Sequence, residues 1–160
     1  MTIEPGPAAH FDADFDGAIV RASPNFGERR TDEAPHLIVL HYTGLATGPG
    51  AEDWLCAPES EVSSHYLVHE DGRIVQLVPE EKRAWHAGRS FWRGIEDVNS
   101  ASVGIEIANG GHAFGLPDFP APQIAAVTAL VRSVMDRHGI GAHDVIAHSD
   151  VAPGRKQDPG

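Results

Sequence analysis

The chain has 160 residues, 41% of them hydrophobic, which suits one globular domain with its own core and leaves little room for two. A formal net charge of -11 would repel a polyanion, so nucleic acid is not an expected partner. No apolar run approaches the roughly 18 residues of a membrane helix, and the acidic, proline-containing start lacks the pattern of a secretory signal, so we expect a cytoplasmic protein without a membrane partner.

Residues 1–35 are predicted to form an irregular N-terminal arm packed on a domain of residues 36–160. The arm contains a turn-forming Ser-Pro-Asn segment at residues 23–25. The apolar run HLIVLHY at residues 36–42 is typical of a strand buried on both faces. We therefore expect it to be a central strand of the domain.

The next segment predicts one helix and one hairpin. A short helix is expected at residues 51–57. Strands are expected at residues 64–69 and 73–78, joined at Asp71-Gly72, a strong hairpin turn signal.

Residues 102–108, SVGIEIA, predict a second buried strand whose two faces differ. One face carries Val103, Ile105 and Ile107, and the other carries Ser102, Gly104 and Glu106. An acidic side chain among apolar and small neighbours is costly to bury without a role. Glu106 is therefore a candidate functional residue.

A long amphipathic helix is expected at residues 121–138, ended by Gly139. Its predicted inward stripe consists of Ile124, Val127, Val131, Val134 and Met135. A short strand at residues 145–147 completes the set. Strands that include a hairpin, together with a long helix, predict a single α/β domain with a mixed central β-sheet flanked by helices.

Two of the ten histidines, His41 and His148, end predicted strands, where rigid scaffolds present reactive groups. A catalytic zinc site needs three protein ligands and keeps a fourth position for water. Asp158 can be the third, because the loop from His148 contains two prolines and a glycine and must turn tightly. Either histidine taken alone also fits a structural role.

Two further residues fit hydrolysis of an amide at such a metal. Glu106 is the best candidate for the general base that takes a proton from the attacking water. Lys156 lies two residues before Asp158, and its ammonium group could face negative charge developing on the attacked carbonyl oxygen. An exposed loop lysine without a role is the alternative for Lys156.

Six segments, in this order, carry a resemblance to AmpD-type zinc-dependent N-acetylmuramoyl-L-alanine amidases: SPNFGERR, LIVLHYTG, VSSHYLVHEDGRIVQLV, AWHAGRSFWRG, NSASVGIEIANGG and AHSDVAPGRKQDPG. The ordered set covers nearly the whole chain and is strongly specific. The resemblance implies the fold shared with phage lysozyme amidases and peptidoglycan recognition proteins. It also implies hydrolysis of the amide between N-acetylmuramic acid, or its 1,6-anhydro form, and L-alanine.

The resemblance assigns roles to the residues already singled out. It implies that His41, His148 and Asp158 hold Zn²⁺, that Glu106 is the catalytic glutamate, and that Lys156 stabilises the transition state.

The resemblance also implies a groove that contacts sugar or stem peptide through Trp85, His86 and Arg89, with help from Asn99. Trp85 fits a core position equally well, since an indole packs as readily as it stacks on a sugar.

The expected partner is a muropeptide or peptidoglycan fragment that enters cell-wall recycling, and the expected state is a monomer. One alternative is a peptidoglycan-binding module without catalysis, which the complete set of ligand types disfavours. Another is a phage-type endolysin acting on polymeric wall, in which cysteine often replaces the ligand at Asp158. Relatives usually continue past the DPG with a short aromatic segment, so we expect either that the chain continues beyond Gly160 or that one wall of the groove is missing.

Overall fold

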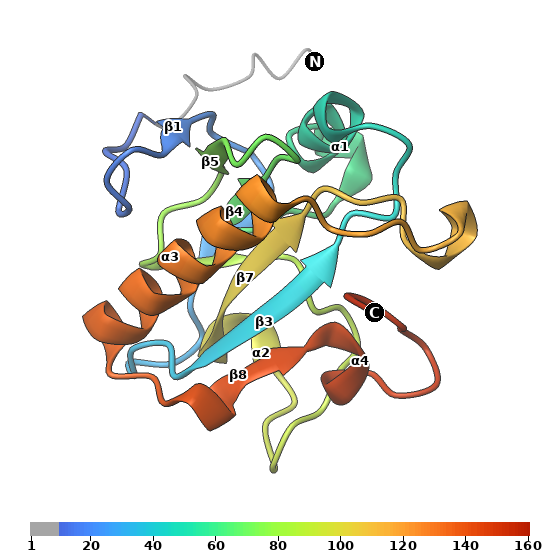
Figure 1. The fold of residues 1–160 in the computed structure, drawn as a ribbon. Helices are drawn as coiled ribbons and strands as arrows, with labels where there is room; N and C mark the ends of the chain where they lie inside the picture. Colours follow the sequence, from blue (N-terminus) through green and yellow to red (C-terminus); the bar gives the residue numbers. More distant parts are fainter. Residues whose placement is uncertain (1–9) are drawn as a thin grey trace, which may run out of the picture.

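Two long apolar strands lie side by side in a six-stranded mixed sheet, as the computed structural model of residues 10–160 shows (Figure 1). They are β3 (Leu37–Tyr42) and β7 (Ser102–Ile107), which pair in parallel. The sheet has the order β1-β5-β4-β7-β3-β8, completed by β1 (Ile19–Val20), β4 (Tyr66–Val68), β5 (Ile74–Gln76) and β8 (Val145–Ala147). A separate pair joins β2 (Phe26–Glu28) to β6 (Lys82–Ala84). The predicted α/β class with a mixed sheet is confirmed.

The predicted hairpin is present as β4 and β5, the antiparallel pair of the larger sheet. Its turn uses the expected residues: Gly72 has a φ of +89°, and the Asp71 side chain accepts a hydrogen bond of 2.9 Å from the amide of Arg73. Both strands are shorter than the alternating pattern predicted, since each pairs over three residues.

The described part of the N-terminal arm is more regular than expected, because it contains β1 and β2. Residues 1–9 of the predicted arm lie outside the described residues. Arg29 fastens the arm through its guanidinium group, which donates hydrogen bonds to the carbonyls of Glu80, Asn99, Ser100 and Ser102.

Helix α3 (Ala121–His138) covers one face of the sheet and has the predicted bounds (Figure 1). Gly139 ends it with a φ of +66°. Helix α1 (Gly48–Leu55) begins three residues before the predicted start, where Thr47 accepts a hydrogen bond from the amide of Gly50. The remaining helices are the single turns α2 (Val98–Ala101) and α4 (His148–Val151), with 3-10 turns at Pro58–Ser60, His112–Phe114 and Ala142–Asp144.

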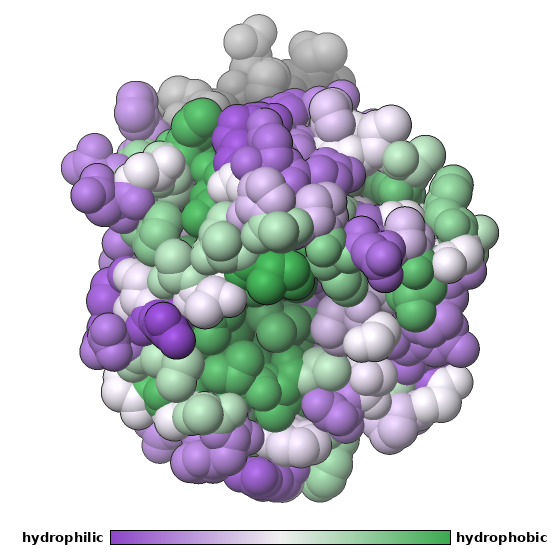
Figure 2. Space-filling model, viewed as in Figure 1, coloured by the Kyte–Doolittle hydropathy of each residue, from purple (hydrophilic) through white to green (hydrophobic). Residues whose placement is uncertain are grey.

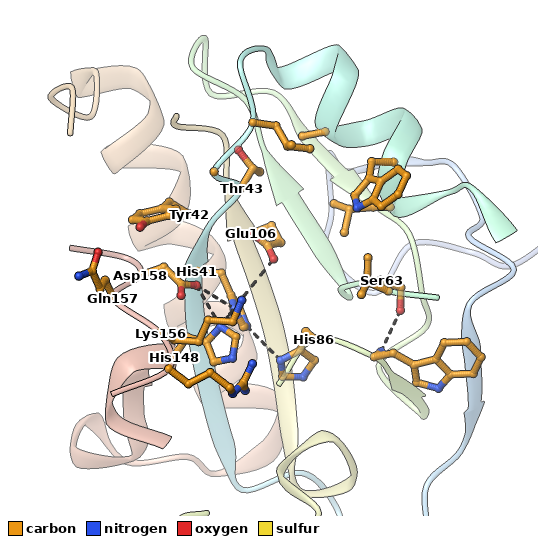
Figure 3. A pocket seen from close by; sticks show the side chains of 18 of the residues that line it. His41, Tyr42, Thr43, Ser63, His86, Glu106, His148, Lys156, Gln157 and Asp158 are labelled. Atoms are coloured by element: carbon orange, nitrogen blue, oxygen red, sulfur yellow. Dashed lines mark hydrogen bonds and ion pairs between the residues drawn. The ribbon is translucent and has the colours of Figure 1, made fainter. Parts of the chain in front are cut away.

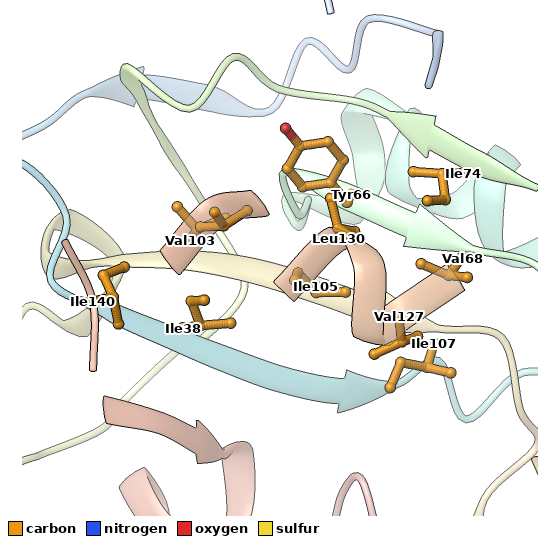
Figure 4. Packing of buried hydrophobic residues seen from close by; sticks show 11 residues of the cluster. Ile38, Tyr66, Val68, Ile74, Val103, Ile105, Ile107, Val127, Leu130 and Ile140 are labelled. Atoms are coloured by element: carbon orange, nitrogen blue, oxygen red, sulfur yellow. The ribbon is translucent and has the colours of Figure 1, made fainter. Parts of the chain in front are cut away.

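The main core lies between α3 and the sheet (Figure 4). Its buried side chains come from β3, β4, β5, β7, α3 and the second residue after α3: Ile38, Tyr66, Val68, Ile74, Val103, Ile105, Ile107, Val127, Leu130, Val134 and Ile140. The predicted faces of β7 are confirmed, because its three branched apolar residues all belong to this core. Its other face is left for polar groups.

The predicted stripe of α3 was wrong at Ile124, which is 46% exposed. Gln123 is fully buried instead, and its side-chain amide donates to the carbonyls of Val68 and Ala108 at 3.1 and 2.8 Å. Val68 ends β4 and Ala108 follows β7, so these hydrogen bonds tie the first turn of the helix to the ends of both strands. The periodicity of apolar residues alone cannot predict these hydrogen bonds of the Gln123 side chain.

The face of the molecule seen in Figure 1 is mainly hydrophilic at its rim, with hydrophobic residues gathered near its centre (Figure 2). Strand β8 pairs with β3, and the half-buried Leu40 and Val145 of these strands pack against the main core. Within residues 10–160, none of the helices combines the length and the apolar character that crossing a membrane requires.

A buried carboxylate joins the end of α3 to the sheet. Glu80 is 3% exposed and accepts hydrogen bonds from the Tyr66 hydroxyl at 2.7 Å, from Arg137 Nε at 3.1 Å and from His138 Nε2 at 2.8 Å. Burial alone would raise the pKa of Glu80, but the hydrogen bonds from Arg137, Tyr66 and His138 lower that pKa below its ordinary value.

We expect Glu80→Ala to lower the free energy of unfolding by about 3 kcal/mol at pH 7, because it removes the buried acceptor of three hydrogen bonds and leaves the buried Tyr66 hydroxyl without a partner. Since the folded-state pKa of Glu80 is lowered, its contribution is full above the ordinary glutamate pKa and is lost as the pH falls through the folded value. Urea unfolding at pH 7 and in acid measures both effects.

The exposed Glu59 provides the matched control, and Glu59→Ala should change the free energy of unfolding by less than about 0.5 kcal/mol. A Glu80→Ala protein as stable as the wild type at pH 7 would contradict this account of Glu80.

Candidate active site

Three predicted ligands, His41, His148 and Asp158, meet beyond the ends of neighbouring parallel strands (Figure 3). His41 Nδ1 lies 2.9 Å from His148 Nδ1 and 3.2 Å from Asp158 Oδ2, and His148 Nδ1 lies 3.1 Å from the same oxygen. His41 is in β3, and His148 directly follows β8, which pairs with β3 in parallel. Asp158 is held there as the amide of Ser149 donates to its carbonyl at 3.0 Å.

These three groups can offer electron pairs to one shared ion. His148 Nε2 lies 2.9 Å from the carbonyl oxygen of Ala87, which can only accept, so Nε2 carries the hydrogen and Nδ1 has a free electron pair. Burial lowers the pKa of His41 to about 4, which keeps its ring neutral at pH 7. A cation between these atoms, which lie within 4.8 Å of one another, would receive an electron pair from each.

The donor set fits zinc, because two imidazole nitrogens and one carboxylate oxygen make up a three-ligand catalytic site. All three side chains are buried, with His41 1%, His148 4% and Asp158 6% exposed, and all three line the groove above them.

Glu106 stands beside this centre because of strand register, since it is the partner of His41 in the parallel pair of β3 and β7. Its Oε1 lies 3.9 Å from His41 Nδ1, and its buried Oε2 has no hydrogen-bond partner among the described residues. Burial and the nearby charge of Asp158 raise the pKa of Glu106 well above its ordinary value, and Lys156 opposes the shift. An unpartnered buried carboxylate beside a water-accessible centre is suited to accept a proton.

A groove opens above the centre, and Lys156 is an exposed residue of its lining. Its wall includes large apolar side chains that the sequence did not identify: Leu45, Trp54 and Val62 are 37%, 47% and 37% exposed. They come from the loop after β3, from α1 and from the segment before β4. No sequence signal marks them, because apolar residues on short elements predict a core equally well.

The four predicted substrate contacts are placed differently from one another. Trp85 is half-buried in the groove lining, and His86 also borders the groove. The structure does not bring Arg89 and Asn99 into it. Arg89 is exposed elsewhere, and Asn99 is buried behind the groove, where its Oδ1 accepts from the amides of His86 and Ala87 at 3.1 and 2.8 Å.

The sequence profile of the N-acetylmuramoyl-L-alanine amidase family matches residues 31–160. The chain is 38% identical over 155 residues to the 1,6-anhydro-N-acetylmuramyl-L-alanine amidase AmpD of Escherichia coli. The match covers 86% of this chain and 82% of AmpD. Its fold is similar to a crystal structure of an AmpD derivative, with a TM-score of 0.80 and 32% identity over 91% of this chain and 89% of that one.

The fold is also similar to that of AmiD from Escherichia coli in complex with the substrate anhydro-N-acetylmuramic acid-L-Ala-D-gamma-Glu-L-Lys. The TM-score is 0.71 at 36% identity, and the match covers 85% of this chain and 61% of the AmiD chain.

We expect the purified protein to bind about one zinc ion per chain, and His41→Ala or His148→Ala to abolish stoichiometric binding, because two protein ligands would remain. Elemental analysis after dialysis measures this directly. His69→Ala is the matched control, since His69 is also buried but pairs with Glu52 away from the groove, and it should retain zinc. Unchanged zinc in either ligand variant would remove that residue from the ligand set.

Proposed function

Because this chain belongs to the N-acetylmuramoyl-L-alanine amidase family and is an enzyme of that class, we propose that it hydrolyses the amide between the muramoyl group and L-alanine in soluble muropeptides, with zinc held by His41, His148 and Asp158. One observation carries the proposal: two imidazole nitrogens and a carboxylate oxygen converge beneath an open groove, next to Glu106, whose buried Oε2 has no hydrogen-bond partner within residues 10–160.

Zinc bound there would polarise the scissile carbonyl and lower the pKa of the attacking water. Glu106 accepts the proton of that water, because its Oε1 lies 3.9 Å from His41 Nδ1 and the described residues donate no hydrogen bond to its Oε2. Lys156 stabilises the negative charge that develops on the carbonyl oxygen, since its ammonium group lines the same groove.

The groove fits a substrate with an apolar side and a polar peptide. Leu45, Trp54 and Val62 form an apolar surface, and Trp85 adds an indole that can stack on a sugar ring. AmiD was solved with an anhydromuramyl peptide, so we propose this class of fragment as the substrate. Cleavage of such fragments belongs to cell-wall recycling in the cytoplasm, and we propose a monomer as the active form.

The complete set of groups argues against a binding module without catalysis, because such a module needs neither three convergent ligands nor Glu106. Asp158 and the match to most of AmpD also favour recycling over a phage-type endolysin. Digestion of anhydromuropeptides and of insoluble wall, with products identified by mass, separates the two activities: faster release from insoluble wall would favour the endolysin.

We expect Glu106→Ala to retain its zinc and its fold but to lose on the order of 10² to 10⁴ in turnover, because a general base is removed and the ligands stay. Product formation from an anhydromuramyl peptide and zinc content are measured on the same sample. The exposed control Glu59→Ala should keep wild-type turnover. Wild-type turnover in zinc-loaded Glu106→Ala would require a different base, with Tyr42 in the groove as the next candidate.

Lys156→Ala should also keep its zinc and lose roughly 10² to 10³ in turnover, as expected when one group that stabilises the oxyanion is removed. The loss should appear in kcat more than in KM, because the charge exists mainly in the transition state. Arg132→Ala, on the surface of α3, tests whether loss of any exposed cation has the same effect. A pure rise in KM would instead assign Lys156 to substrate binding.

A further inference from the structure

His86 and Ala87 contact the outer nitrogens of both metal-binding histidines. His86 Nδ1 lies 3.0 Å from His41 Nε2, and the Ala87 carbonyl accepts from His148 Nε2 at 2.9 Å. We infer that this dipeptide positions the two histidine ligands of the metal centre. In this role His86 determines which ring nitrogen of His41 carries the hydrogen, and it does not bind substrate. The inference rests on the proposed zinc site.

The nitrogen of His41 that carries the hydrogen follows from a series of hydrogen bonds that begins at a backbone carbonyl. Ser102 Oγ lies 2.6 Å from the carbonyl oxygen of Val98, which can only accept, so the serine hydroxyl donates there. The hydroxyl has no second hydrogen. His86 Nε2, 3.1 Å from the same Oγ, must therefore carry a hydrogen and donate it to Ser102.

The series of hydrogen bonds continues through the imidazole ring of His86 to the metal centre. His86 is 8% exposed, and no carboxylate of the described residues contacts it, so the buried ring is neutral and its Nδ1 has a free electron pair. His41 Nε2 must then donate to His86 Nδ1. His41 Nδ1 is left with its electron pair directed at His148 and Asp158, the form that a metal requires (Figure 3).

The dipeptide is held from three sides. Asn99 Oδ1 accepts from both of its amides, and Arg155 Nη2 donates to the Ala87 carbonyl at 2.8 Å. The His86 ring lies against Gly104 of β7, where a β-carbon would come within 2.5 Å of the ring carbons. Residue 104 must therefore lack a side chain for the ring to reach Ser102 and His41 together.

The test measures zinc affinity of the metal-free protein by competition with a chromophoric chelator. His86→Leu keeps the bulk but has no acceptor for His41, and we expect zinc affinity to fall on the order of 10- to 100-fold, as for other groups that orient metal ligands. His86→Asn restores an acceptor oxygen near the position of Nδ1 and should recover most of the affinity. Ser102→Ala, which removes only one hydroxyl, should also weaken zinc binding.

His69→Leu is the matched control, because it removes another buried histidine whose partner, Glu52, lies outside the centre. It should lower the Tm of the metal-free protein and leave zinc affinity unchanged. If His86→Leu does not fold, Ser102→Ala carries the test. Wild-type zinc affinity in folded His86→Leu or in Ser102→Ala, or no recovery in folded His86→Asn, would overturn the inference. Absence of zinc binding in the wild type would overturn the proposed function instead.

Discussion

The register of β3 between two parallel neighbours is the constraint on which the rest of the site depends. In one direction it sets His41 opposite Glu106 of β7, and in the other it sets Leu40 opposite Ala147, the residue before His148. A slip of one residue would turn the side chains of β3 to the opposite faces of the sheet. The main core resists such a slip, because Ile38 and the apolar face of β7 are buried under α3.

The same sheet keeps the core and the chemistry on opposite faces. Val103, Ile105 and Ile107 of β7 pack under α3, whereas Ser102 contacts His86, Gly104 leaves room for the His86 ring, and Glu106 faces His41. On the latter face the three candidate ligand atoms of His41, His148 and Asp158 lie within 4.8 Å of one another. The surrounding hydrogen bonds hold the candidate ligands in place, so that a cation would bind to side chains that are already positioned.

Much of the fold follows from local sequence patterns. Continuous apolar runs predicted β3 and β7, the Asp-Gly pair predicted the hairpin turn, and Gly139 marked the end of α3. The rotation of α3 about its axis could not be predicted. It places Gln123 inside, where the side chain donates hydrogen bonds to two carbonyls at strand ends that are distant in sequence. The short strands of the arm were missed for a similar reason, since they exist only through pairing with β5 and β6.

By itself, the sequence determined the chemical groups of the site and their order: two histidines at strand ends, an isolated glutamate on an apolar strand, and a tight loop that carries Lys156 and Asp158. Only the tertiary structure decided what surrounds them. His86 and Asn99 were expected to contact substrate, yet the ring nitrogens of His86 and the side-chain oxygen of Asn99 are engaged with protein atoms. The physical reason is that a side chain's role depends on which partner satisfies its hydrogen bonds, and these partners lie 12 to 45 residues away along the chain.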